Sequence, residues 1–85
     1  MPADRAESFV REVVLVLKKN RLERDISINK LSWLSGVSPK GIAFIEDGKN
    51  SPTLRNVIRL ADALEMPLVE LIGDAEKAWE IRNGD

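Results

Sequence analysis

The sequence predicts an all-α fold in a single small domain, and three observations support this architecture. Apolar residues recur at the spacing of a helix face, whereas the strict alternation of a half-buried strand is absent. Helix start signals precede the apolar stretches, and glycine or proline ends most of them. The chain has 85 residues, which is enough for one small domain with a single hydrophobic core.

The first helix is predicted from about Arg5 to Arg24, with Asp4 and Glu7 as a capping pair at its start. One face of this helix is apolar at helical spacing until it ends on an arginine: Val10, Val13, Val14, Leu17 and Arg21. Further apolar residues extend the face beyond that stripe: Phe9, Leu15 and Val16. This surplus indicates either a broad contact within the core or a subunit interface.

Residues 27–48 are predicted to form two short helices joined by a tight turn. Ser27 can cap the first of them, and Gly36 suits the left-handed position at which that helix ends, since glycine adopts it at little cost. Ser38 and Pro39 are typical of the N-cap and first residue of the second helix. This arrangement is typical of a helix-turn-helix, which projects its second helix into a DNA groove.

A loop is predicted at residues 47–52, where Gly48 ends the second helix of the motif. Thr53 is expected to cap a fourth helix that runs from Leu54 to Leu64. The predicted buried face of that helix consists of Leu54, Val57, Ile58, Ala61 and Leu64.

Two more short helices are predicted after Pro67 interrupts the fourth. The apolar residues of the first are Leu68, Leu71 and Ile72, and Gly73 is expected to stop it. The second is predicted from Asp74 to Arg82, with Asp74 as its cap. Burial of Trp79 would stabilise this segment by about 2–3 kcal/mol. We therefore expect it to dock on the surplus apolar face of the first helix, in the same subunit or a partner.

The composition argues against catalysis and against a membrane span. The chain has no histidine, cysteine or tyrosine, so the most common general bases, thiol nucleophiles and soft metal ligands are missing. We therefore expect no enzyme activity, no metal and no cofactor. No apolar run approaches the roughly 20 residues of a membrane span, and the lack of cysteine fits a reducing cytoplasm, where we expect the protein.

Charge is distributed unevenly along the chain, although the net charge is only −1. Residues 1–59 contain eleven lysines and arginines against seven aspartates and glutamates, whereas residues 60–85 contain two against seven. A chain polarised in this way can present a basic face to a polyanion. The distribution therefore fits DNA binding, which the net charge alone would not suggest.

Fifteen residues between the first helix and the predicted fifth form one characteristic pattern of residue types and intervals. They are Leu17, Arg21, Ser27, Leu31, Gly36, Val37, Ser38, Ile42, Ile45, Glu46, Gly48, Pro52, Ala61, Leu64 and Leu71. In these residues the chain resembles the phage-repressor/Cro-type (XRE-like) helix-turn-helix domain, over about residues 10–72. The resemblance implies a five-helix DNA-binding domain, residues 1–73, followed by a short C-terminal helical tail, residues 74–85. It also implies a homodimeric, sequence-specific transcription regulator on a two-fold operator in double-stranded DNA. The chain is similar in length to small restriction–modification controllers and prophage regulators.

The resemblance also implies which residues contact DNA. The recognition helix spans about residues 38–46, and its base-reading positions are Pro39, Lys40, Ala43 and Phe44. Lysine can donate to guanine, apolar side chains can pack on thymine methyl groups, and proline offers only shape. For Phe44, a place in the core is the alternative. Phosphate contacts are implied at Ser27, Ile28, Ser38, Lys49 and Asn50, where helix N-terminal amides and loop side chains face the DNA backbone.

The chain departs from the family pattern at Ile28, where glutamine is common, and at Asp47, whose carboxylate repels phosphate. Arg21 and Glu46 occupy positions that the family pairs, so the resemblance implies an ion pair that holds the recognition helix against the first helix. A surface pair of little energetic value is the alternative.

Trp33 stands where the family has an exposed polar residue, which leaves a partner surface and simple exposure as alternatives. The residues expected in dimer contacts or in packing of the tail are Leu68, Leu71, Ile72 and Trp79. The alternative function on the same fold is an antitoxin-type module that binds a protein partner.

Overall fold

The computed structural model describes residues 4–84, and within that range it contains five α-helices and no strand. The helices are α1 (Arg5–Glu23), α2 (Ile28–Ser35), α3 (Pro39–Glu46), α4 (Leu54–Ala63) and α5 (Leu68–Asn83). The predicted all-α class is therefore confirmed. Residues 1–3 and 85, which belong to the expected domain and tail, lie outside the described residues.

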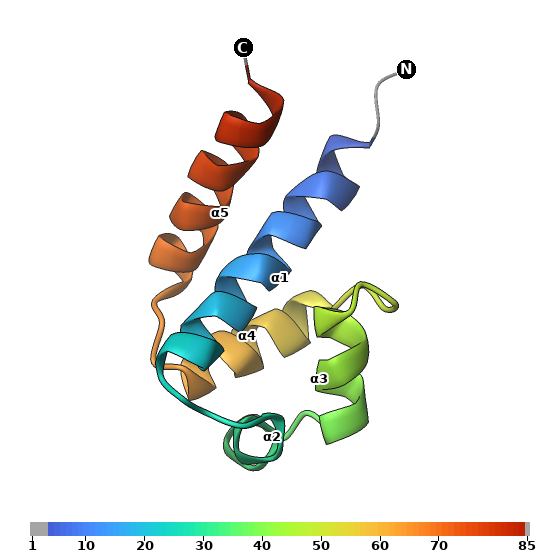
Figure 1. Ribbon diagram of the computed structural model, residues 1–85, viewed down its shortest axis with the longest axis vertical. Coiled ribbons are helices and arrows are strands. Elements are labelled where there is room, and N and C mark those ends of the chain that lie inside the picture. Colours follow the sequence, from blue (N-terminus) through green and yellow to red (C-terminus); the bar gives the residue numbers. More distant parts are fainter. Residues whose placement is uncertain (1–3, 85) are drawn as a thin grey trace.

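The two long helices, α1 and α5, lie side by side and run in opposite directions, and their contact is the most extensive between any two helices (Figure 1). The three shorter helices gather around the end of α1 that is remote from the chain termini (Figure 1). In this group α2 packs on both α3 and α4, and α3 also contacts α1. The described part of the chain measures 39 × 23 × 20 Å.

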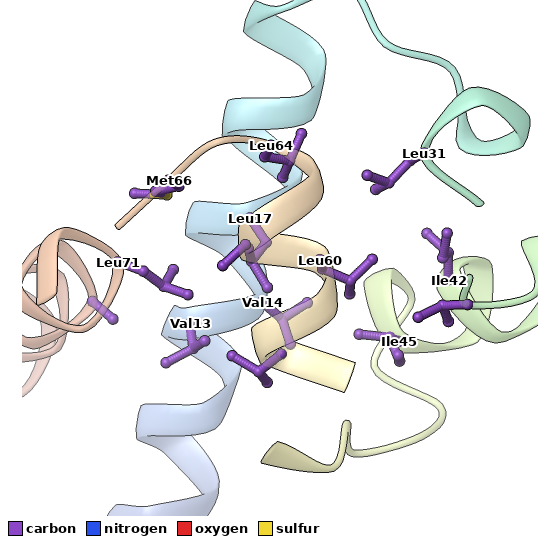
Figure 2. Close-up of a cluster of buried hydrophobic side chains, with 14 residues drawn as sticks. Val13, Val14, Leu17, Leu31, Ile42, Ile45, Leu60, Leu64, Met66 and Leu71 are labelled. Carbon is purple, nitrogen blue, oxygen red and sulfur yellow. The ribbon is translucent and has the colours of Figure 1, made fainter. Parts of the chain in front are cut away.

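All five helices contribute to one hydrophobic core, together with residues in two of the connections. Figure 2 shows the side chains of this core converging between α1, α4 and the flanking helices. The buried apolar residues are Val13, Val14, Leu17, Leu31, Val37, Ile42, Ile45, Val57, Leu60, Ala61, Leu64, Met66, Leu71 and Ala75. Full burial of a leucine or isoleucine side chain contributes about 1.5–3 kcal/mol, so this cluster supplies the main force that orients the helices.

Three of the predicted helix starts, at Ser27, Ser38 and Thr53, are confirmed by hydrogen bonds. The side chains of Ser27, Ser38 and Thr53 each accept a bond from the backbone amide three residues ahead, at 3.0, 3.0 and 3.1 Å. Each bond satisfies one of the amides that the first turn of a helix leaves without an internal partner. The predicted glycine turn is also present, since Gly36 ends α2 in the left-handed conformation with φ of 78°.

The prediction that Gly73 stops a short helix is wrong, and so is the assignment of Asp74 as a cap. The chain forms one continuous α5, so the expected tail is the second half of that helix. A glycine inside a helix costs about 1 kcal/mol. Leu71 and Ala75 on either side of it are fully buried, which offsets that cost because the helix must continue for both to pack.

The buried face of α4 also differs from the prediction at Leu54, Ile58 and Leu60. Ile58, which was predicted to be buried, is half-buried and lies outside the core. Leu54 is 73% exposed, whereas Leu60, which the prediction omitted, is 3% exposed. The buried face follows residues 57, 60, 61 and 64, which fit helical spacing. Leu54 lies in the first turn of α4, beside the exposed end of the preceding loop, and does not join the core.

The surplus apolar face of α1 is covered in part by α5 of the same chain, since Phe9 and Val16 are half-buried whereas Leu15 remains 39% exposed. The indole Nε1 of Trp79 donates a hydrogen bond to Ser8 Oγ at 2.7 Å. The guanidinium of Arg5 lies 4.8 Å from the Trp79 ring centroid and 5.3 Å from that of Phe9. The alternative left open by the sequence is therefore resolved for Trp79, which packs within its own subunit.

Candidate nucleic-acid interface

The orientation of α3 is set by its buried side. Ile42 and Ile45 are 1% and 5% exposed, and both belong to the core shared with α1, α2 and α4. Because side chains three and four residues apart share a helix face, this burial fixes the opposite side of α3 as its outer face. Figure 1 shows α3 at the edge of the molecule, on the side away from α5.

The four residues that the resemblance assigns to base reading lie on α3, in different environments. Pro39 and Lys40 in the first turn are exposed, whereas Ala43 and Phe44 are half-buried. None of the four belongs to the buried core or to the residues packed directly against it. Phe44 is therefore placed at the outer face of α3, and the core alternative for this residue is excluded.

The Phe44 ring stands between two lysine side chains. The Nζ atoms of Lys40 and Lys49 each lie 5.5 Å from the ring centroid. The Phe44 carbonyl accepts hydrogen bonds from the amides of Lys49 and Asn50, at 2.9 and 3.3 Å. The structure thus brings the loop residues expected at phosphate next to the residues expected at bases.

Ser27 and Ser38, which were expected to contact phosphate, act as the N-caps of α2 and α3. Ser27 and Ser38 are both exposed, and each side-chain oxygen accepts a bond from its own helix. The side chain of Ile28 is half-buried and packs against the core, so only its backbone amide is placed to face a ligand. Lys49 and Asn50 are exposed in the loop that follows α3.

Arg21 and Glu46 form a two-bond ion pair that joins α1 to the last residue of α3. Arg21 Nε donates to Glu46 Oε2 at 2.8 Å, and Nη2 donates to Oε1 at 2.9 Å. Both side chains are 9% exposed, and Arg21 Nη1 also donates to the Ile26 carbonyl at 2.8 Å. The hydrogen bond to Glu46 raises the pKa of Arg21 against the opposing effect of burial. The pair therefore holds α3 against α1.

The residues expected in dimer contacts divide into two groups. Leu71 is fully buried in the core of its own chain, and Trp79 is half-buried against α1, so both serve packing within the subunit. Leu68 and Ile72 are 39% and 42% exposed on the first turns of α5 and remain accessible. Trp33 is 78% exposed on α2.

Sequence reasoning missed a second ion pair, in which the carboxylate is buried and the arginine side chain is 63% exposed. Glu12 in α1 is 5% exposed, and its Oε2 lies 2.8 Å from Arg82 Nε near the end of α5. The available signal was position: Glu12 falls between Phe9 and Val16 on the surplus apolar face. Once α5 covers that face, a carboxylate on it requires a partner, because an unpaired buried charge is costly.

A groove of about 390 Å³ lies between the first half of α1 and the loop after α3. Its lining is mixed in character: Glu7, Val10, Arg11, Val14, Leu15, Ile45, Glu46, Asp47, Gly48, Lys49, Asn50, Ser51 and Pro52. In residues 4–84 no group of three or more acidic, histidine or cysteine side chains is placed to hold a metal ion. No helix in that range combines the length and apolar character needed to cross a bilayer.

Comparison with known proteins agrees with this geometry. The model of a helix-turn-helix family matches residues 17–71. The HTH-type transcriptional repressor RghR of Bacillus subtilis (strain 168) is 39% identical over an alignment of 70 residues, which covers 78% of this chain and 52% of that protein. The chain thus spans about half the length of this curated relative. No solved structure matches the chain.

Proposed function

The chain belongs to the helix-turn-helix family, and from this premise we propose that it is a sequence-specific transcription regulator that binds DNA as a homodimer. One observation carries the proposal. Within residues 4–84, Lys40 on the outer face of α3 stays exposed, while a buried ion pair holds the helix in place. The similarity to a protein named as a transcriptional repressor supports the same function.

In this proposal α3 and its cap, residues 38–46, enter the major groove. Lys40 donates to guanine O6 and N7, the most common specific contact. Ala43 and Phe44 present apolar atoms that fit thymine methyl groups, and Pro39 shapes the entry of the helix. Because each specific contact of this kind contributes about 1–3 kcal/mol, a few of them suffice for discrimination.

Affinity comes mainly from contacts to the DNA backbone in this proposal. The first amides of α2, beside Ser27 and Ile28, and the N-terminus of α3 at Ser38 face phosphates. Lys49 and Asn50 add side-chain contacts from the loop. Binding is expected to weaken steeply with salt, because each neutralised phosphate releases counterions.

The dimer places two copies of α3 in successive major grooves, with half-sites about 34 Å apart. The accessible residues Leu68 and Ile72 on α5 are the proposed contact between subunits. The protein acts in the cytoplasm in this proposal, where a bacterial-type regulator meets its operator.

Selection of bound sequences from random DNA tests the proposal. We expect a two-fold symmetric sequence with half-sites one helical turn apart, and recovery of no consensus would overturn the proposal. Lys40→Ala should relax discrimination at one base pair in each half-site. Lys77→Ala removes the same charge from the exposed surface of α5 and serves as the matched control. Equal effects of the two substitutions on base preference would refute the role of Lys40.

An antitoxin-type module that binds a protein partner is the second candidate, because Trp33 is exposed on α2 without packing against the core. Co-expression with the product of the adjacent gene tests this function. A complex that survives gel filtration and is lost in Trp33→Ala, together with no binding to the upstream DNA of its own gene, would favour it over the regulator.

A further inference from the structure

Phe44 is the point at which the recognition helix and the following loop meet. Lys40 precedes it by one turn of α3, and Lys49 follows it in the loop, yet both ammonium groups lie 5.5 Å from the centroid of its ring. None of the ion pairs within residues 4–84 involves either lysine. Both ammonium groups therefore share a cation–π contact with the Phe44 ring.

The backbone brings Lys49 back toward Phe44. Gly48 turns the chain with φ of 77°, in the left-handed region that glycine adopts at little cost. The amides of Lys49 and Asn50 then donate to the Phe44 carbonyl. These bonds fix the backbone of Lys49 beside Phe44. The ring therefore has to orient only the flexible methylene chain of the Lys49 side chain.

Lysine is a flexible side chain that loses rotamer freedom when it binds a ligand. An ammonium group over an aromatic face is favoured at an exposed site by a factor of about 2–5 in the equilibrium constant. That preference reduces the ordering cost which each lysine would otherwise meet on contact with DNA. Two ammonium groups held at one ring also concentrate positive charge, which attracts a phosphate.

We propose that Phe44 is a positioning residue that orders Lys40 for base reading and Lys49 for phosphate contact before DNA binds. The proposal rests on the proposed function and deepens it, because it couples the specific contact to the backbone contact through one aromatic ring. It differs from packing of Phe44 on a thymine methyl group, which would act on DNA directly and leave the lysines unaffected.

Proton NMR of the free protein tests the geometry without DNA. The ε-methylene protons of Lys40 and Lys49 should show upfield ring-current shifts that disappear in Phe44→Leu and return in Phe44→Tyr. Lys77 serves as the reference, since no aromatic ring within residues 4–84 lies against its ammonium group. Circular dichroism establishes that each variant is folded. Wild-type shifts equal to those of Lys77 would overturn the proposal.

A double-mutant cycle on the selected DNA sequence tests the coupling. Phe44→Leu and Lys49→Met should be coupled by a factor of about 2–5 in Kd, the range expected for an exposed cation–ring contact. Phe44→Leu and Lys77→Met should show a coupling factor of one. Because Phe44 is uncharged, a change in the salt dependence of binding in Phe44→Leu can arise only through charged neighbours.

Replacement of thymine by uracil in the operator separates the two roles of Phe44. If uracil weakens DNA binding by the wild type but not by Phe44→Leu, the ring contacts a thymine methyl group. Such a result, together with no coupling between Phe44 and Lys49, would overturn the positioning role. Failure of the wild-type chain to bind any DNA would overturn the proposed function itself. DNA binding in which Phe44→Leu and Lys49→Met show a coupling factor of one would overturn the positioning role alone.

Discussion

The replacement of Glu46 by alanine leaves the Arg21 guanidinium without its carboxylate in a site where the arginine side chain is only 9% exposed. Loss of one partner of a buried pair costs about 3–5 kcal/mol. We expect a loss of about 3 kcal/mol, at the lower end of that range, because Arg21 keeps its hydrogen bond to the Ile26 carbonyl. A domain of this size has a free energy of unfolding of about 4–13 kcal/mol.

Urea unfolding followed by circular dichroism measures the loss, and thermal unfolding should show Tm lower by about 12–24 °C. Glu46→Gln should lose less than Glu46→Ala, because the amide oxygen still accepts one bond from Arg21. The double variant Arg21→Met/Glu46→Leu should recover most of the stability, since it leaves no unpaired charge. A loss below about 1 kcal/mol for Glu46→Ala would refute the reasoning and assign the pair to the weak surface class.

The pH dependence of the same pair follows from the raised pKa of Arg21. A raised folded-state pKa contributes stability that is fully present below the unfolded-state pKa and is lost only as the pH rises through the folded value. For arginine both values lie far above neutral pH. The stability difference between the wild type and Arg21→Met should therefore be the same at about pH 7 and about pH 9.

Three further predictions concern stability, each measured by urea unfolding. Gly36→Ala should lower the free energy of unfolding by about 1–2 kcal/mol, because φ is 78° there. Gly73→Ala should raise it by about 0.5–1 kcal/mol, since this helical position has open space around it. A loss of stability in Gly73→Ala would contradict the account of α5. Arg82→Met should lose about 1–3 kcal/mol by leaving the Glu12 carboxylate buried and unpaired, and Glu12→Leu in that background should restore it. Trp79→Leu should lose about 1–2 kcal/mol with its packing and hydrogen bond to α1; an unchanged stability would mean that the indole does not hold α5 in place.

Local signals explain what the sequence predicted well. Ser27, Ser38 and Gly36 act through hydrogen bonds and dihedral preferences within a few residues, so their roles are readable without a fold. The Arg21–Glu46 pair was accessible in a different way, through the resemblance, because its two members are 25 residues apart.

Signals that are weak or absent locally account for the errors. Two helix ends carry a residue other than glycine in the left-handed region, Asp25 with φ of 57° and Glu65 with φ of 55°. Arg24 links these ends, since it donates to the Leu64 carbonyl and pairs with the Glu65 carboxylate at 3.1 Å. The opposite case is Gly73, where a local stop signal was overruled by burial of the residues around it. At Gly73, tertiary packing therefore overruled the local signal.

The candidate site shows the same limit. Helical spacing and the resemblance assigned Lys40, Ala43 and Phe44 to α3, and burial of the opposite face is consistent with that assignment. The proximity of Lys49 to Phe44 was not predictable, because it depends on how the loop folds back after Gly48. A side chain's neighbours across a loop are set by backbone geometry that residue types alone do not specify.

Two ion pairs attach the two halves of α1 to different helices. Glu12 in the first half pairs with Arg82 on α5, whereas Arg21 in the last turn pairs with Glu46 on α3. Since α1 has neither glycine nor proline and spans 19 residues, it is a continuous rod about 28 Å long between these attachments. In a dimer formed through α5, each α1 would connect the subunit contact to α3 and so set the separation of the two α3 helices. The spacing of the half-sites would then depend on both ion pairs.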